Sequence, residues 1–349
     1  MSISSVRTPA QSPESKIALQ LVEKLQAYFV SKLDDLAHTF GKGEACKAVE
    51  WFRDEGKHGG GVRYEARDEN IFNRGSVNVS QVHYDDDASK KLASATAIST
   101  IIHPKNPHAP SMHMHISWTQ MRDGKGYWRI MADLNPSMKD AVSTRTFDMM
   151  LDKAAGAYAD EGVEQGDRYF NIPLLNRTRG VSHFYLENFN TNDFEADKSF
   201  AKNMGEKVID AYIGIVLQAL QYYISYTAEE KAKQLDYHTL YLFQVLTSDR
   251  GTTSGLLIHD QNDVGIMGSI PSHVNGELLS SWLELMPKPQ DELLKGLLEA
   301  LPNEMPTPVD ETSQKALANA VRSHYKKYPE ALRFQASGEV LPSTVDNHR

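Results

Sequence analysis

Four histidines lie close together in one short stretch, and their type and spacing could support several kinds of chemistry. His103, His108, His113 and His115 are four of the 13 histidines in the chain. His113 and His115 are two residues apart, and on a strand this spacing directs both side chains to one face, about 6.6 Å apart. Such a pair could bind a metal ion, donate a proton, or lie half-buried and hydrogen-bonded to the backbone.

A metal site is one hypothesis for these histidines. His103 lies in a separate predicted strand, where it could complete a ligand set with His113, His115 and Asp133. Imidazole and carboxylate groups are common ligands of divalent metals, and in this hypothesis His103 and His113 are metal ligands. Two-residue histidine patterns also arise by chance, so ordinary strand histidines are the alternative.

A carboxylate and two arginines are further candidates. Asp133 ends an apolar strand in the stretch ADLNPS, where it could act as a base or cap the turn before Pro136. Arg179 and Arg250 each precede a glycine. An arginine in such a turn can present its guanidinium fork to a carboxylate, although an exposed turn arginine is the alternative for each.

The elements that must position these side chains can be predicted from the apolar pattern. Apolar residues at helical spacing predict helices, and alternation between turn residues predicts strands. The predicted helices span 16–40, 137–161 and 194–226, and strand-and-turn patterns span 61–82, 95–104, 112–121, 126–134, 238–247 and 253–270. Strands outnumber the crossover helices that a parallel sheet needs. We therefore expect an α+β fold with one antiparallel sheet covered by helices.

The domain organisation is predicted from length and local composition. A chain of 349 residues allows one large domain or two ordinary ones. We expect a polar, disordered tail over residues 1–14 and a single domain over residues 15–303. The proline-containing stretch EMPTPVDET predicts that residues 304–349 form a linker and a C-terminal tail, partly helical and partly disordered.

Composition excludes several classes of function. The net charge of −9 argues against general nucleic-acid binding, which needs clustered lysines and arginines. Cys46 is the only cysteine, so four-cysteine zinc sites and iron–sulfur clusters with thiolate ligands are excluded. The sequence contains no apolar run of about 18 residues, so no transmembrane helix is expected. We expect a cytoplasmic protein.

Several motifs resemble the oxygen-dependent coproporphyrinogen III oxidase family. The longest is STIIHPKNPHAPSMH, residues 99–113, which is similar to the family pattern S-x-x-x-H-P-x-N-P-x-x-P-T-x-H. Other similar motifs are WFRDEG at 51–56, GGGVR at 59–63, DLNP at 133–136, RGV at 179–181, DRGT at 249–252 and SIP at 269–271. The motifs keep the family's order over most of the folded chain.

The resemblance implies a fold and a reaction. It implies a large flat antiparallel sheet with helices on both faces, in a homodimer. The implied reaction is the oxidative decarboxylation of two propionates of coproporphyrinogen III to vinyl groups, which gives protoporphyrinogen IX in haem synthesis. Molecular oxygen is the co-substrate, no organic cofactor is needed, and a divalent metal requirement is left open.

The resemblance also implies roles for individual residues. Asp133 corresponds to the family's proposed base, which takes a pyrrole N–H proton, and His113 corresponds to the proton donor. Ser99 and Arg250 correspond to substrate-contacting positions. If the chain is this enzyme, we expect Arg179 to bind a substrate carboxylate together with Arg250.

The chain departs from the family pattern at several polar positions. Ser117 stands where the family has an arginine that binds a propionate, and the glycine-rich lead into Asp133 is replaced by RIMA at 129–132. Candidates to replace the lost groups are His115, which we assign to substrate binding, and His183, Arg129 and Arg145. Two alternatives stay open: a non-catalytic relative that binds a tetrapyrrole or haem through His113 or His115, and a metal-dependent enzyme that uses histidines and Asp133.

Overall fold

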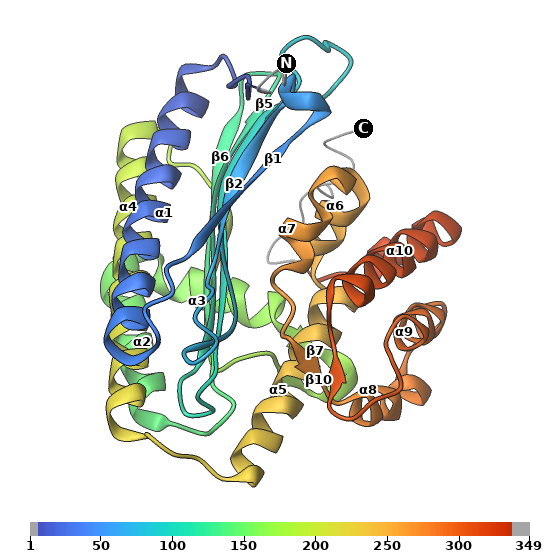
Figure 1. Ribbon diagram of the computed structural model, residues 1–349. Coiled ribbons are helices and arrows are strands. Elements are labelled where there is room, and N and C mark those ends of the chain that lie inside the picture. Colours follow the sequence, from blue (N-terminus) through green and yellow to red (C-terminus); the bar gives the residue numbers. More distant parts are fainter. Residues whose placement is uncertain (1–5, 337–349) are drawn as a thin grey trace, which may run out of the picture.

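The centre of the molecule is an antiparallel sheet of seven strands in the order β1-β2-β3-β4-β5-β6-β9. This computed structural model describes residues 6–336. The strands are β1 (Lys47–Phe52), β2 (Gly59–Glu65), β3 (Phe72–His83), β4 (Leu92–Pro104), β5 (Ser111–Met121), β6 (Gly126–Asn135) and β9 (Ser182–Phe189). Helices cover both faces of this sheet (Figure 1), and the predicted α+β class is confirmed.

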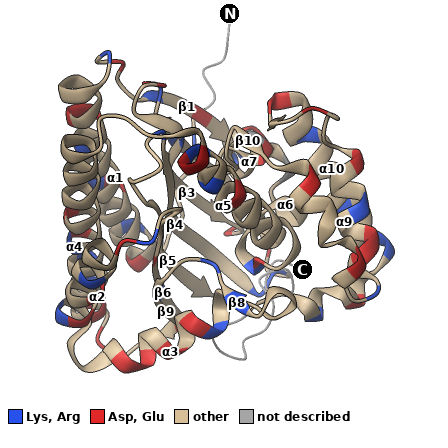
Figure 2. Ribbon diagram, turned by 90° about the horizontal axis from the view of Figure 1, so that it is seen from below, with Lys and Arg blue, Asp and Glu red and all other residues tan. Residues whose placement is uncertain are grey.

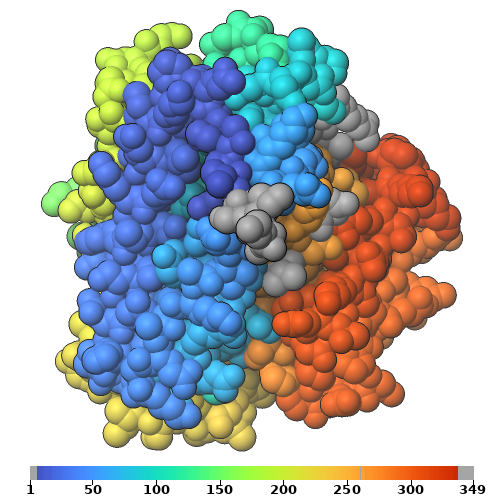
Figure 3. Space-filling model, turned by 45° about the horizontal axis from the view of Figure 1, so that its top comes forward, coloured from blue at the N-terminus to red at the C-terminus, as the bar shows by residue number. Residues whose placement is uncertain are grey.

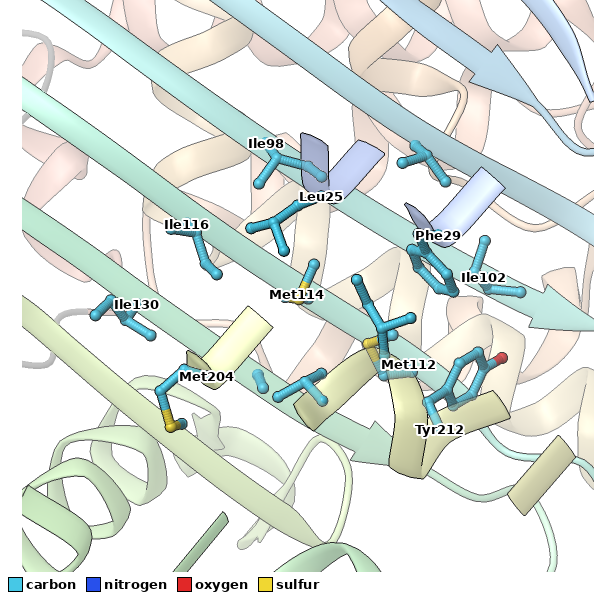
Figure 4. Close-up of a cluster of buried hydrophobic side chains, with 14 of the residues drawn as sticks. Leu25, Phe29, Ile98, Ile102, Met112, Met114, Ile116, Ile130, Met204 and Tyr212 are labelled. Atoms are coloured by element: carbon cyan, nitrogen blue, oxygen red, sulfur yellow. The ribbon is translucent and has the colours of Figure 1, made fainter. Parts of the chain in front are cut away.

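Long amphipathic helices cover the first face of the sheet. They are α1 (Pro13–Phe40), α2 (Ala141–Ala155) and α4 (Phe194–Tyr222), and α3 (Ala159–Tyr169) packs against β9. Figure 4 shows Leu25 and Phe29 of α1 and Met204 of α4 against even-numbered residues of the central strands, such as Ile98 and Met114. Because successive strand residues point to opposite faces, the odd-numbered residues of these strands point away from this core.

The C-terminal helices cover the second face and have a core of their own. They are α5 (Ala228–Thr247), α6 (Arg250–Ile258), α7 (Asp263–Met267), α8 (Gly276–Ser281), α9 (Gln290–Glu299) and α10 (Glu311–Lys327). Ile101 of β4 belongs to this second core together with leucines of α5, α9 and α10. In the space-filling view the C-terminal part of the chain, coloured orange and red, forms one side of the surface beside the blue N-terminal elements (Figure 3).

Two small antiparallel pairs complete the strands. They are β7 (Asn171–Ile172) with β8 (Arg177–Thr178), and β10 (His273–Val274) with β11 (Thr307–Pro308). Lysines, arginines and acidic residues lie along the outer helices, whereas the central strands carry few of them (Figure 2). No helix in the described part of the chain is both long and apolar enough to cross a membrane.

Two predicted strands are wrong. Residues 238–247 belong to helix α5, and residues 253–270 contain the rest of α6, a short 3-10 turn and α7. Every residue from Tyr237 to Thr247 is buried. A helix buried on all sides loses the 3.6-residue apolar period, and its run of aromatic and β-branched residues therefore imitates a buried strand.

Both ends of the described chain contact the folded body. The Thr8 amide donates to the carbonyl of Gly56 and the Ala10 amide to the side chain of Gln81, within the predicted tail 1–14. At the other end, α10 contributes Leu317 and Val321 to the second core, within the predicted linker and tail 304–349. Residues 1–5 and 337–349 of these predicted tails lie outside the described residues.

Candidate active site

A cavity of about 260 Å³ lies between the second face of the sheet and the helices α5, α6 and α7. On β5 and β6 the strand side of its wall is built by odd-numbered residues, because these point away from the first core. The predicted site residues in the wall are Ser99, His113, His115, Arg179 and Arg250, and Ser117 and Arg129 also line it. The structure therefore brings together most of the residues that the sequence singled out.

Strand register sets the order of side chains on the cavity wall. On the paired strands β5 and β6, His113 lies opposite Asp133, His115 opposite Met131, and Ser117 opposite Arg129. Ser99 of β4 lies opposite His115 on its other side. This register places the polar side chains of Ser99, His113, His115, Ser117 and Arg129 close to one another on the cavity wall.

Asp133, His113 and Arg179 form a cluster at the base of this row. An Arg179 Nη2 group donates to both carboxylate oxygens of Asp133, at 3.0 and 2.9 Å. The His113 Nδ1 lies 3.1 Å from Asp133 Oδ1, and Asn135 donates to Oδ2 at 2.5 Å. Asp133 and Arg179 are both fully buried, whereas the His113 side chain is 15% exposed. The imidazole is thus the most exposed member of the cluster, and Arg179 also lines the cavity.

The charges in this cluster stabilise each other. Burial alone would raise the pKa of Asp133, but the Arg179 guanidinium and the hydrogen bond from His113 outweigh it and hold the pKa below its ordinary value. Burial would lower the pKa of Arg179, and the Asp133 carboxylate instead raises it. Asp133 is therefore an ionised carboxylate with a low proton affinity.

Arg179 is also held from its other side. Its Nη1 donates to Gln244 of α5 at 2.7 Å, and its guanidinium lies over the rings of Phe170 and Tyr241, 4.6 and 5.0 Å from their centroids. Gln244 and Tyr241 belong to α5, whose residues 238–247 are predicted as a strand from the apolar pattern. Gln244 and Tyr241 were therefore missed, and only the Arg-Gly turn indicated that a functional arginine was present.

Arg250 has a buried carboxylate partner of its own. It begins α6, whose N-cap is Asp249, and its guanidinium contacts Glu187 of β9. Tyr169 donates its hydroxyl to Asp249 at 3.0 Å and so fixes the start of the helix. Glu187 is fully buried, and no motif in the sequence indicated it.

His103 and His108 are separate from this cluster. Both ring nitrogens of His103 face protein atoms, Ser111 Oγ at 2.8 Å and the Ser269 carbonyl at 3.1 Å. The ring of His108 stacks on Tyr223, and its Nε2 contacts Glu230 at 2.9 Å. Among residues 6–336, no group of three histidine, cysteine or acidic side chains is arranged to hold a metal ion. The described residues therefore do not fit the metal-centre hypothesis.

Two of the candidate replacement residues lie elsewhere. Arg145 is exposed on α2, which covers the opposite face of the sheet. His183 contacts Asp167 at 2.8 Å and the carbonyl of Arg179 at 2.6 Å, and it supports the turn that carries Arg179. His115 does line the cavity, and burial lowers its pKa to about 3, so its imidazole is neutral.

The chain is similar to proteins of one known family. The family model for coproporphyrinogen III oxidase matches residues 18–292. A mitochondrial oxygen-dependent coproporphyrinogen-III oxidase from Rattus norvegicus is 27% identical over 276 residues, which cover 72% of this chain and 60% of the rat protein.

Two further relatives carry the name oxygen-dependent coproporphyrinogen-III oxidase. The one from Rickettsia akari is 30% identical over 64% of this chain and 82% of its own length. The one from Drosophila melanogaster is 27% identical over 81% of this chain and 75% of its own length. The chain belongs to the coproporphyrinogen III oxidase family.

Proposed function

We propose that this chain catalyses the oxygen-dependent decarboxylation of coproporphyrinogen III to protoporphyrinogen IX in haem biosynthesis. Family membership supports the reaction class. The observation that carries the proposal is the cluster of His113, Asp133 and Arg179 at the wall of a cavity that also contains further arginines. A substrate with four carboxylates needs such cations.

His113 is the proton carrier in this proposal. Its Nδ1 faces the Asp133 carboxylate, which fixes the ring so that the imidazole is presented to the cavity. A histidine oriented in this way by a buried carboxylate can act as a general acid or base toward a bound substrate. The protons in question are the pyrrole N–H proton, whose loss makes the ring electron-rich, and the hydrogen that the propionate loses from its ring-attached carbon as it becomes a vinyl group.

Asp133 and Arg179 act through His113 in this proposal. Asp133 is fully buried, and its low pKa makes it a weak proton acceptor. The geometry therefore favours Asp133 as the residue that orients the imidazole, rather than as the base itself. Arg179 keeps Asp133 ionised and in place through its two hydrogen bonds.

Oxygen is the electron acceptor in the proposed reaction. Each propionate that becomes a vinyl group loses carbon dioxide and two electrons, and molecular oxygen takes these electrons. The proposal includes no organic cofactor and no step on a metal. A homodimer, which the family resemblance implies, and a cytoplasmic location, which is expected from the sequence, are further parts of the proposal. Sedimentation and cell fractionation would test them.

Turnover of coproporphyrinogen III in air tests the proposal. We expect protoporphyrinogen, detected by chromatography after oxidation, in air and none without oxygen. A His113→Asn variant should lose about 10²–10⁴-fold in rate while it still binds coproporphyrin. Tight porphyrin binding with no turnover by the unmutated protein would overturn the proposal and favour a binding protein.

One observation supports that binding alternative. The neutral His115 imidazole lines the cavity beside His113, and a neutral imidazole can ligate haem iron. A haem titration followed by the Soret band, with His115→Ala as the variant, would separate the two functions.

A further inference from the structure

The arginines in the cavity wall differ in their surroundings. Arg179 is held by Asp133, and Arg250 contacts Glu187. Each of these two guanidiniums therefore lies beside a buried carboxylate of the protein.

Arg129 lies near aromatic side chains of the cavity wall. Its guanidinium is 5.8 Å from the ring centroid of Tyr127. Arg129, Tyr127, Tyr169 and Tyr185 all line the cavity. A guanidinium in a cavity wall offers several N–H donors in a fork that matches a carboxylate.

The position of Arg129 suits a second anionic group of the same ligand. Arg129 and Asp133 are four residues apart on β6 and point to the same face, so their Cα atoms are about 13 Å apart. His113 lies directly opposite Asp133. One tetrapyrrole can therefore place one carboxylate near His113 and another within reach of the long Arg129 side chain.

Ser117 leaves space for that carboxylate. It is the cross-strand partner of Arg129 and also lines the cavity. Side chains directly opposite each other on antiparallel strands lie about 4.5–5.5 Å apart at Cβ. A guanidinium moved from position 129 to position 117 would therefore occupy nearly the same part of the wall.

We propose that Arg129 binds a substrate carboxylate other than the one being decarboxylated, and so orients the tetrapyrrole over His113. This inference rests on the function proposed above. Arg129 is a substrate-positioning residue that this chain supplies from β6, one strand away from Ser117.

Binding of coproporphyrin III, followed by fluorescence titration, tests the inference. Arg129→Ser should weaken binding about 10–100-fold, because a charge-assisted, bidentate contact is lost. The double variant with Arg129→Ser and Ser117→Arg should restore most of the affinity. Coproporphyrin tetramethyl ester, in which the carboxylates are masked, should bind the Arg129→Ser variant as well as it binds the unmutated protein.

Three results would overturn the inference: undiminished binding by Arg129→Ser, an equal loss for the ester, or a double variant no tighter than the single one. Arg129→Met keeps the aliphatic length of the side chain and replaces Arg129→Ser if the latter does not fold. Coproporphyrin is not turned over, so its binding is measured independently of the reaction. If coproporphyrin binding depends on Arg129 but coproporphyrinogen is not decarboxylated, the proposed function alone is contradicted. Decarboxylation together with binding that is independent of Arg129 would contradict this inference alone.

Discussion

At the scale of single residues, the ion pair of Asp133 and Arg179 dominates the response of the site to mutation. Both side chains are fully buried, and removal of one partner leaves an uncompensated charge, which typically costs about 3–5 kcal/mol. We expect Asp133→Asn and Arg179→Met each to lower the free energy of unfolding by about this amount. The double variant should lose less than the sum of the two, and urea unfolding of all four proteins measures this coupling. Strictly additive losses would contradict the pairing.

A second residue-scale prediction concerns His238 of α5. Burial, and to a smaller extent the charge of His273, lowers the pKa of His238 to about 3, below its ordinary value of about 6.5. The neutral ring therefore contributes stability that is present above about pH 6.5 and is lost as the pH falls, at up to about 1.4 kcal/mol per pH unit.

The variant His238→Gln cannot titrate in this range. We expect its free energy of unfolding to fall less steeply than that of the unmutated protein between pH 6.5 and 4, as measured by urea unfolding at several pH values. Parallel curves for the two proteins would show that His238 is not the group that titrates.

The sequence identified single site residues better than it identified their partners. His113 and Asp133 were singled out by spacing and motif, and the structure places them opposite each other. The pairing of Asp133 with Arg179 joins residues 46 positions apart, and it depends on how β9 aligns beside β6. Such a contact is set by tertiary register and not by any local pattern, so it could not be predicted from one sequence.

At the scale of elements, two helical glycines should respond in opposite ways to alanine. A Cβ at Gly162 of α3 would overlap the ring of Phe184 on β9, whereas a Cβ at Gly214 of α4 would meet no described atom within 4 Å outside its own helix. Gly162→Ala should destabilise the protein by about 1–3 kcal/mol through overpacking. Gly214→Ala should stabilise it by about 0.5–1 kcal/mol, because alanine favours the helix. Thermal unfolding of both variants measures this, and the same sign for both would refute the close packing of α3 on β9.

The elements of the sheet could be predicted more reliably than those of the second helical layer. The predicted strands 95–104, 112–121 and 126–134 correspond to β4, β5 and β6, because one face of each strand packs on α1 and α4 and the alternation is visible. Helix α5 is buried along its whole C-terminal half, so tertiary packing, and not local periodicity, decides its structure.

At the scale of the whole molecule, the sheet separates two hydrophobic cores that position different parts of the site. The first core fixes the strands through α1 and α4, and the second core places α5, α6 and α7 over the cavity wall. Arg179 connects the two parts, since it bonds to Asp133 of β6 and to Gln244 of α5. A change at this one arginine therefore affects both the strand side and the helix side of the site.

The size of the cavity implies movement of the helices above it. Its volume of about 260 Å³ is below the roughly 300–1,000 Å³ of pockets that hold drug-sized ligands, and a tetrapyrrole with four propionates is larger than most of these. The segment 250–267 is tied down by Arg53, which donates to the Ile258 carbonyl at 2.6 Å, and by Gln261, which accepts from the Asp54 amide at 2.7 Å. We infer that this segment shifts to admit the substrate.

Hydrogen exchange measured by mass spectrometry tests this movement. Saturation with coproporphyrin III should change exchange in residues 250–267 more than in α4, which lies on the opposite face of the sheet. Arg53→Ala should increase exchange in 250–267 without ligand, because its bond to the Ile258 carbonyl is lost. Arg122→Ala is the matched control, since Arg122 bonds to carbonyls of residues 84, 87 and 90 and not to this segment. If a bound porphyrin left exchange in 250–267 unchanged, this segment would not be the part that moves. Other walls of the cavity would then have to move to admit the ligand.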